Sequence, residues 1–128
     1  MVRAVIDTNV IISAIKTPGG ASAKIIDLVL SEKVKLYLSS EILEEYIDVL
    51  ARPKHNLSVE YQRAFIDAIR EVGVLVEPTQ SDVPLRDEDD RAFYDLAKEL
   101  GLVLVTGDND LLVLREDFIK TPIEFLRD

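Results

Sequence analysis

The sequence predicts an α/β fold, a three-layer α/β/α sandwich in which a central parallel sheet of about five strands carries helices on both faces. Two observations predict it. Short apolar runs typical of buried strands alternate along the chain with segments whose apolar residues repeat at helical spacing. Helical crossovers between such strands make the strands parallel and place helices against the faces of the sheet.

Five apolar runs are expected to form the strands. The first four are short and continuous, as strands buried on both faces of a parallel sheet should be. The fourth run is the clearest because it is apolar and partly β-branched, whereas the last is weak. In chain order the expected strands are Val2–Ile6, Val34–Leu38, Val74–Val76, Leu102–Val105 and Ile123–Phe125.

Helical patterns fill the intervals, and local residues indicate where the helices begin and end. Asn9 is expected to cap the first helix and Ser58 the fourth, since short polar side chains accept hydrogen bonds from free helix amides. Pro53 follows the end of the third helix, and Gly73 and Gly101 close the fourth and fifth. The expected helices are Asn9–Ile15, Ser22–Leu30, Ser40–Leu50, the residues from Ser58 to Val72, Ala92–Leu100 and a short one that Asp108 or Asp110 opens and that runs to Leu114.

The composition indicates one folded domain over residues 1–128. Of the 128 residues 48% are hydrophobic, which is enough to build a core. The absence of cysteine excludes a disulfide framework, a cysteine zinc site and thiol catalysis. No apolar run reaches the roughly 18 residues of a membrane-spanning helix, so we expect a soluble cytoplasmic protein that does not enter a membrane.

The net charge of −9 argues against a general nucleic-acid binder, because such proteins are usually basic. It does not argue against a nuclease, since the carboxylates of a metal site count in that sum until cations bind them. Some basic residues can still cluster locally, or they are ordinary solvated charges. These candidates are Lys16, Lys24, Arg52, Lys54, Arg115 and Lys120.

Carboxylates follow two of the expected strands directly: Asp7 ends the first, and Asp108 follows the fourth. The carboxyl ends of parallel strands meet at one edge of the sheet, where open α/β folds bind their ligands. Carboxylates gathered there are usually neutralised by a hard divalent cation such as Mg²⁺. Helix capping is the alternative role, but Asn9 and Asp110 are better placed for it, which leaves Asp7 and Asp108 free for a metal.

A second acidic run, Asp87–Asp90, opens the fifth expected helix. Asp87 is expected as its N-cap. Glu88 and Asp89 need no further purpose than a favourable interaction with the helix dipole. Asp90 lies on the packed side of the helix, where a carboxylate needs a partner.

Glu44 and Glu45 are a harder case, because both flank the apolar stripe of the third expected helix and periodicity alone does not choose between them.

The single histidine, His55, is expected in a loop, and Ser/His/Asp catalysis has little else to rest on. The sequence contains neither a P-loop nor a G-x-G-x-x-G motif, which excludes nucleotide binding by those routes.

Four segments, in order and over nearly the whole chain, resemble the motifs of PIN domains. Three of the four are Val5-Ile6-Asp7-Thr8-Asn9-Val10, Asp87-Glu88-Asp89-Asp90 followed by Phe93 and Leu96-Ala97, and Leu104-Val105-Thr106-Gly107-Asp108-Asn109-Asp110-Leu111-Leu112. They resemble the opening, central acidic and closing motifs of the family. The stretch from Leu43-Glu44-Glu45-Tyr46 through Val49-Leu50-Ala51-Arg52-Pro53-Lys54 is similar to the second motif of the VapC-like toxins of toxin–antitoxin pairs.

The resemblance implies a PIN-like fold and an endoribonuclease that uses Mg²⁺ or Mn²⁺ to hydrolyse RNA, leaving a 5′-phosphate and a 3′-hydroxyl. It also implies an antitoxin protein as partner and a homodimer. Glu45 is preferred over Glu44 because it stands five residues before Leu50, as the family's glutamate stands before its leucine. The implied catalytic acids are Asp7, Glu45, Asp90 and Asp108, of which Asp7, Asp90 and Asp108 hold the metal, with Asn9, Thr106, Asp110 and Asp87 in support.

Arg52 and Lys54 are candidates for contacts to the RNA backbone, since lysine and arginine supply most phosphate contacts. Arg52 also stands at a helix end, where the dipole alone favours a cation. Two other functions stay open: a PIN-like fold kept only for binding, and a phospho-receiver domain. The latter needs an aspartate after the middle strand, where Glu77-Pro78 follows Val74–Val76, and a lysine, for which Lys120 is available.

Overall fold

The computed structural model describes residues 1–128 and contains five strands. They are β1 (Val2–Ile6), β2 (Val34–Leu38), β3 (Val74–Leu75), β4 (Val103–Val105) and β5 (Ile119–Lys120). They form one sheet in the order β3-β2-β1-β4-β5, and every neighbouring pair is parallel. The predicted α/β fold with a parallel sheet of about five strands is confirmed. β3, third along the chain, lies at the edge of the sheet and not in its middle.

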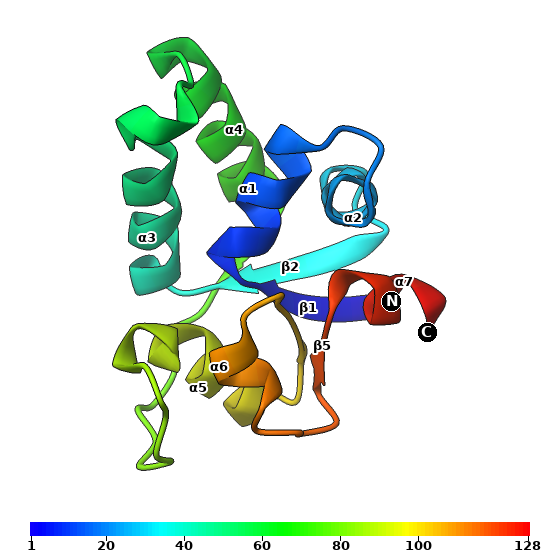
Figure 1. Cartoon of the computed structure of the whole chain (residues 1–128), viewed down its shortest axis with the longest axis vertical. Helices are drawn as coiled ribbons and strands as arrows, with labels where there is room; N and C mark the ends of the chain where they lie inside the picture. Colours follow the sequence, from blue (N-terminus) through cyan, green and yellow to red (C-terminus); the bar gives the residue numbers. More distant parts are fainter.

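Seven α-helices and two 3₁₀ turns connect the strands. The helices are α1 (Thr8–Lys16), α2 (Ala21–Leu30), α3 (Ser40–Leu50), α4 (Val59–Val72), α5 (Arg91–Leu100), α6 (Asn109–Leu112) and α7 (Pro122–Arg127), and the turns are η1 (Pro53–His55) and η2 (Glu88–Asp90). Figure 1 shows α1 to α4 on one face of the sheet and α5 and α6 on the other, which gives the expected three layers.

The last predicted strand, Ile123–Phe125, is wrong, because these residues lie in α7. Thr121 and Glu124 form a capping box in which the Thr121 hydroxyl accepts from the Glu124 amide at 3.2 Å and the Glu124 carboxylate accepts from the Thr121 amide at 2.9 Å. Pro122 occupies the first helical position, where its missing N–H costs nothing. These residues favour a helix over a strand.

The predicted ends of α4 and α5 are confirmed. The hydroxyl of Ser58 accepts from the Tyr61 amide at 3.1 Å, and Gly101 closes α5 with φ +66°, a conformation that glycine adopts without strain. Gly73 closes α4, and a Cβ there would lie 2.8 Å from the Ile69 carbonyl oxygen as well as 2.7 Å from Leu38 Cδ2, so the end of α4 favours glycine.

The two central strands of the sheet, β1 and β4, determine where a ligand site can form. Val5, Ile6 and Leu104 in the two central strands are fully buried, as expected for strands covered on both faces. β1 and β4 are neighbours, and the chain leaves β1 toward β2 on one side and reaches β5 from β4 on the other. Their carboxyl ends therefore form the topological switch point at which open α/β sheets bind ligands.

None of the helices is both long and apolar enough to cross a membrane.

Candidate metal centre

The carboxyl ends of β1 and β4 hold Asp7 and Asp108 next to each other. The Asp7 amide donates to the Val105 carbonyl at 2.9 Å, which extends the pairing of the two strands by one residue. Thr106 then links the two acids, because its hydroxyl donates to Asp7 Oδ2 at 2.7 Å and accepts from the Asp108 amide at 3.0 Å. The arrangement expected from the two strand ends is therefore present.

Asp90 completes a group of three carboxylates. It reaches the switch point from η2, and oxygen atoms of Asp7, Asp90 and Asp108 all lie within 4.8 Å of one another. Asp90 is 7% exposed, and its Oδ2 is buried without a hydrogen-bond partner. A buried carboxylate oxygen without a donor calls for a cation, and three carboxylates form the hard oxygen donor set that Mg²⁺ and Mn²⁺ prefer. The chain's own residues thus fit a divalent metal ion.

The pKa values of these carboxylates also indicate that the group needs a cation. Burial raises the pKa of Asp7 to about 6, although the hydrogen bond from Thr106 works in the other direction. Burial, followed by repulsion from Asp108 and Asp7, raises the pKa of Asp90 to about 7. Without a cation, folding brings together carboxylates that disfavour one another's charge.

Asp108, and not Asp110, caps α6, so the predicted capping assignment is wrong. α6 begins at Asn109, which puts Asp108 at the N-cap, and its Oδ1 accepts from the Asp110 amide at 2.9 Å. Capping uses one carboxylate oxygen and leaves the second for a metal. Asp110 instead pairs with Arg86 at 3.3 Å.

Asn9 does not cap α1, contrary to the prediction. The helix begins one residue earlier, at Thr8, and Asp7 occupies the N-cap with its side chain turned to Thr106. The Asn9 side chain accepts from the Gly107 amide at 3.4 Å instead, which places it beside the two strand ends.

The prediction that Asp87 caps the fifth helix is wrong, because α5 begins at Arg91 with Asp90 at its N-cap. Asp87 caps the preceding turn η2, where it accepts from the Asp89 amide at 2.9 Å. Its carboxylate also belongs to a second group with Asp90 and Asp110, again within 4.8 Å. Asp87 and Asp110, both predicted to support the site, therefore adjoin the metal group through Asp90.

Glu45 lies at the site and Glu44 does not line it. A pocket of about 380 Å³ is lined by Glu45 together with Asp7, Asp90 and Asp108. The Thr8 hydroxyl donates to Glu45 Oε2, and burial raises the pKa of Glu45 above its ordinary value despite this bond. The geometry makes the choice that helical periodicity left open.

Two features of the site escaped the sequence reasoning. Thr8 has no predicted role in the site, although it follows Asp7 directly. Its place in the first turn of a helix, immediately after an acid that ends a strand, is the sequence signal that indicates such a role. His55 lies in η1, in place of the expected loop, and lines the pocket beside Arg52 and Lys54. Neither of its ring nitrogens has a hydrogen-bond partner.

The order of these acids along the chain is that of a known family. The model of the PIN domain family matches residues 3–110. The chain belongs to the PIN domain family. The match spans the three strand-end and helix-start acids that converge in the structure, and it confirms the resemblance seen in the motifs. That these acids bind metal and carry catalysis stays a prediction.

A relative and two solved structures are also similar to this chain. The chain is 34% identical over 119 residues to the uncharacterized protein MJ1680 of Methanocaldococcus jannaschii, covering 91% of this chain and 77% of that protein. Its fold is similar to a chain of VapBC2 from Rickettsia felis, solved bound to a DNA fragment from their promoter, with TM-score 0.62, 13% identity and coverage of 93% and 96%. It is also similar to PAE2754 from Pyrobaculum aerophilum, with TM-score 0.61, 16% identity and coverage of 98% and 88%.

Proposed function

We propose that this PIN domain is an endoribonuclease that uses Mg²⁺ or Mn²⁺ to hydrolyse RNA phosphodiester bonds. One observation carries the proposal. Asp7, Asp90 and Asp108 converge within 4.8 Å from three separate elements, and Asp90 Oδ2 is buried without a partner. Carboxylates gathered in this way are costly to the fold unless a cation binds them.

The proposed chemistry divides the work between the metal and the side chains. Asp7, Asp90 and Asp108 would hold the ion. When bound, a divalent ion activates water as a nucleophile and stabilises charge on a phosphate. Glu45 would accept a proton at the pocket, because the bond from Thr8 fixes its orientation and burial raises its pKa toward the working pH. In-line attack would leave a 5′-phosphate and a 3′-hydroxyl.

The lining of the pocket also offers positive charge for the RNA backbone. Arg52 and Lys54 line the pocket with the acids. Arg52 also pairs with Asp48 at 3.2 Å, so part of its charge is already used within the chain. We propose that these two side chains contact phosphates on either side of the scissile bond.

We further propose that the protein is the toxin of a toxin–antitoxin pair, with an antitoxin protein as partner and a homodimer as its working form. Support comes from the second motif, similar to that of VapC-like toxins, and from the fold shared with a chain of VapBC2 over 93% of this chain. Control by an antitoxin protein is consistent with an enzyme that degrades RNA. Purification of the protein together with the product of an adjacent gene tests this part.

RNA cleavage tests the proposed activity. EDTA-treated protein is incubated with mixed RNAs, alone and with added Mn²⁺, alongside Asp7→Asn and the control Glu44→Gln. We expect Mn²⁺-dependent cleavage by the wild type and by Glu44→Gln, and none by Asp7→Asn. A wild type that binds RNA yet never cleaves it would favour the alternative, a PIN domain kept only for binding.

A further inference from the structure

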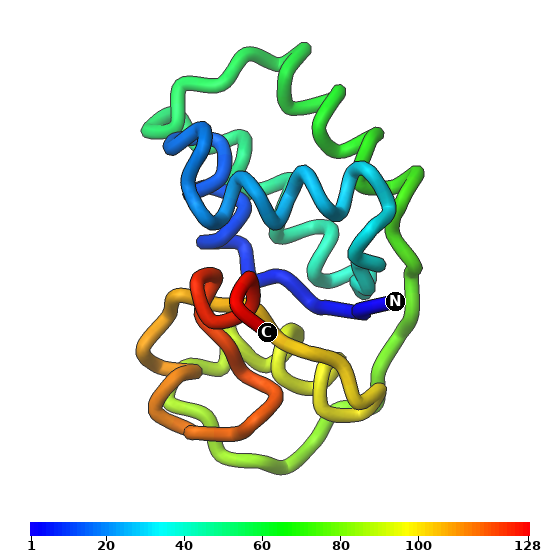
Figure 2. Tube along the Cα trace, turned by 90° about the vertical axis from the view of Figure 1, so that its right-hand side faces the viewer, coloured from blue at the N-terminus to red at the C-terminus, as the bar shows by residue number.

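The acids of η2 reach the site at the end of a long segment without helix or strand. This segment, residues 76–87, connects β3 at the sheet edge to η2. Figure 2 shows it running down the outside of the molecule from one helical layer to the other. Such a segment has no ladder of backbone hydrogen bonds to hold it, so its side-chain contacts decide where η2 lies.

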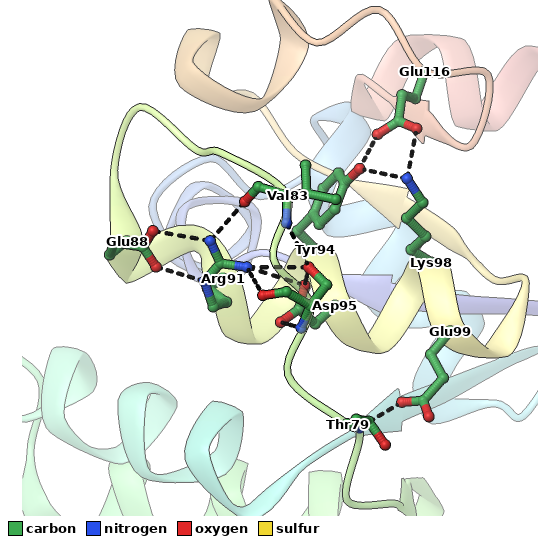
Figure 3. A network of polar contacts seen from close by, with 10 residues as sticks. Thr79, Val83, Glu88, Arg91, Tyr94, Asp95, Lys98, Glu99 and Glu116 are labelled. Carbon is green, nitrogen blue, oxygen red and sulfur yellow. Dashed lines mark hydrogen bonds and ion pairs between the residues drawn. The ribbon is translucent and has the colours of Figure 1, made fainter.

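Arg91, the first residue of α5, binds this segment and η2 at the same time (Figure 3). Its Nη1 donates to the Ser81 carbonyl at 2.8 Å and to the Ser81 hydroxyl at 3.1 Å. Its Nη2 donates to the Val83 carbonyl at 2.7 Å and to Glu88 Oε1 at 2.9 Å, and its Nε donates to Glu88 Oε2 at 2.5 Å. All five N–H groups of the guanidinium are therefore used.

Two more residues of α5 hold the same segment. Asp95 is 4% exposed and accepts from the Ser81 amide at 3.0 Å and from the Ser81 hydroxyl at 2.5 Å. Glu99 accepts from the Thr79 amide at 2.7 Å. One side of α5 thus binds the segment at successive points, and Figure 3 shows that Arg91 is the one that also bonds to Glu88 of η2.

The position of Asp90 depends on this anchoring. Its Oδ2 has no hydrogen-bond partner that would orient the carboxylate, and its backbone amide donates to the Asp87 carbonyl at 3.1 Å within η2. The direction of the side chain is therefore set by the backbone of η2. Arg91 fixes that turn by a two-point bond to Glu88, and it is the next residue in the chain.

We propose that Arg91 is a positioning residue of the metal centre, whose guanidinium clamps the segment 76–87 and the turn η2 onto α5 and so aims Asp90 at Asp7 and Asp108. The inference rests on the proposed function, because it concerns the affinity of that site for a divalent ion. Arg91 follows Asp90 directly in the chain but is not itself among the residues that line the pocket.

The direction of the change in Mn²⁺ affinity distinguishes a positioning role of Arg91 from an effect of its charge alone. Arg91 carries a positive charge near a cluster of acids, so removing it leaves a more negative site, which attracts a divalent cation more strongly. If Arg91 acted only through its charge, Arg91→Gln would bind Mn²⁺ more tightly. A positioning role requires weaker binding.

Lys98 provides a matched control on the same helix. It donates to the Tyr94 hydroxyl at 3.0 Å and pairs with Glu116 at 3.4 Å, a polar network that Figure 3 shows at the far end of α5 from Glu88. Lys98→Gln removes the same charge from the same helix and breaks a comparable network. It leaves the segment 76–87 attached.

Isothermal titration of the full chain with Mn²⁺, without RNA, tests the proposal. We expect Arg91→Gln to bind Mn²⁺ roughly tenfold to a hundredfold more weakly than the wild type, the range typical of residues that orient metal ligands. Arg91→Lys restores the charge but not the two-point fork, so its affinity should stay below that of the wild type. Lys98→Gln should bind like the wild type. Equal or tighter binding by Arg91→Gln overturns the proposal.

Hydrogen exchange of single amides gives a readout that does not need the metal. The Ser81 amide should exchange faster in Arg91→Gln than in the wild type, while the Thr79 amide, held by Glu99, changes less. If Arg91→Gln does not fold, Ser81→Ala, which removes only the hydroxyl of the same network, decides by the same two measurements. Unchanged exchange at residues 81–90 overturns the clamp.

The two proposals fail in different ways. A wild type that binds no Mn²⁺ and cleaves no RNA overturns the proposed function, and with it the role of Arg91 at a metal centre. A wild type that binds Mn²⁺ and cleaves RNA, next to an Arg91→Gln protein of equal affinity, overturns only the positioning role.

Discussion

At the scale of single residues, Asp7 shows how a side chain can cost the fold stability and still be expected to serve function. It is 6% exposed, next to two other carboxylates, and its only strong side-chain partner is the Thr106 hydroxyl. Its pKa of about 6 expresses this cost, since burial disfavours the charged form. Residues that destabilise a fold in this way are typical of functional sites.

Asp7→Asn should therefore act in opposite directions on stability and on activity. Asparagine removes the charge and can still accept from Thr106, so the metal-free variant should be more stable than the wild type at pH 8. The gain should be no more than the roughly 3 kcal/mol that corresponds to raising the Asp7 pKa from 3.8 to about 6. Urea unfolding in EDTA measures it, and RNA cleavage in Mn²⁺ should be lost. A variant that is less stable and still active would remove Asp7 from the site.

Glu45→Gln and Glu44→Gln form a matched pair one residue apart. Glutamine at 45 can still accept from Thr8 but no longer takes up a proton, so we expect cleavage to fall by about 10²–10⁴-fold with little change in melting temperature. Glu44→Gln should change stability by less than about 0.5 kcal/mol and leave cleavage intact. Loss of cleavage in Glu44→Gln alone would reverse the assignment.

Single residues also show where sequence reasoning reaches its limit. Asp7 and Asp108 could be found because a strand end identifies them. Helical periodicity could not separate Glu45 from Glu44, and only the resemblance to PIN domains favoured Glu45, because the contact that distinguishes them is with Thr8, which is 37 residues away in the sequence. The predicted capping roles of Asn9 and Asp110 are wrong for a related reason, since each helix begins slightly earlier than its sequence pattern indicates, and the cap then falls two residues away, on Asp7 and Asp108.

At the scale of elements, the turn η1 and Arg52, the residue before it, bring basic side chains to a pocket that is otherwise lined mainly by acidic, small polar and apolar residues. The turn follows α3 closely, so Arg52 and Lys54 lie within a few residues of the helix that carries Glu45. Burial, followed by repulsion from Lys16, Lys54 and Arg52, lowers the pKa of His55. Positive charge is therefore concentrated here despite the net charge of −9.

Replacing both basic residues, as Arg52→Ala/Lys54→Ala, should weaken RNA binding and make its salt dependence shallower. Removal of one phosphate contact lowers the slope of log affinity against log salt by about 0.7 for a single strand. The measurement is a titration of fluorescent RNA at several salt concentrations, with Asp7→Asn as the background so that the RNA is not cleaved. Lys24→Ala in the same background is the control. An unchanged slope would identify Arg52 and Lys54 as ordinary surface charges.

Elements differ in how far the sequence predicts them. The first four strands are predictable because each lies in a short continuous apolar run, and the longer helices because their apolar residues repeat over several turns. β5 has only two residues, one of them Lys120, so no apolar run indicates it, and the apolar residues of α7 give the nearest such signal. The anchoring of residues 76–87 by Arg91 could not be predicted, since it depends on which side of α5 faces that segment.

At the scale of the whole molecule, the acids make stability depend on pH in an unusual direction. The pKa values of Asp7 and Asp90 are about 6 and about 7 in the folded chain, mainly because both are buried, against 3.8 for an aspartate that is not buried. Between these values the folded state binds more protons than the unfolded state, so the free energy of unfolding falls as pH rises.

The metal-free protein should therefore be more stable at pH 5 than at pH 8. Urea unfolding in EDTA at several pH values measures this trend. The double variant Asp7→Asn/Asp90→Asn is the control, since it should lose most of the pH dependence in this range while the rest of the net charge is kept. Stability that rises from pH 5 to pH 8 in the wild type would contradict the raised pKa values.

Topology explains why these carboxylates meet at all. β1 and β4 are adjacent in the sheet yet about one hundred residues apart in the chain, as the 99-residue separation of Asp7 and Thr106 shows. Alternating strands and helices predicted the sheet, and the resemblance to PIN domains supplied the order of the acids. What the sequence alone could not supply is their distance, because that depends on the packing of η2 and α5 against the central strands.

The most direct test of the central claim, that Asp7, Asp90 and Asp108 form a site for a divalent cation, is the melting temperature of EDTA-treated protein as Mn²⁺ is added. A cation that binds only the folded state at 100 times its dissociation constant adds about 2.7 kcal/mol, which for a chain of this size raises the midpoint by roughly 10 °C. We expect a saturable rise of this order in the wild type and little or none in Asp7→Asn/Asp90→Asn. A midpoint that does not move in millimolar Mn²⁺, or that moves equally in both proteins, would contradict the claim.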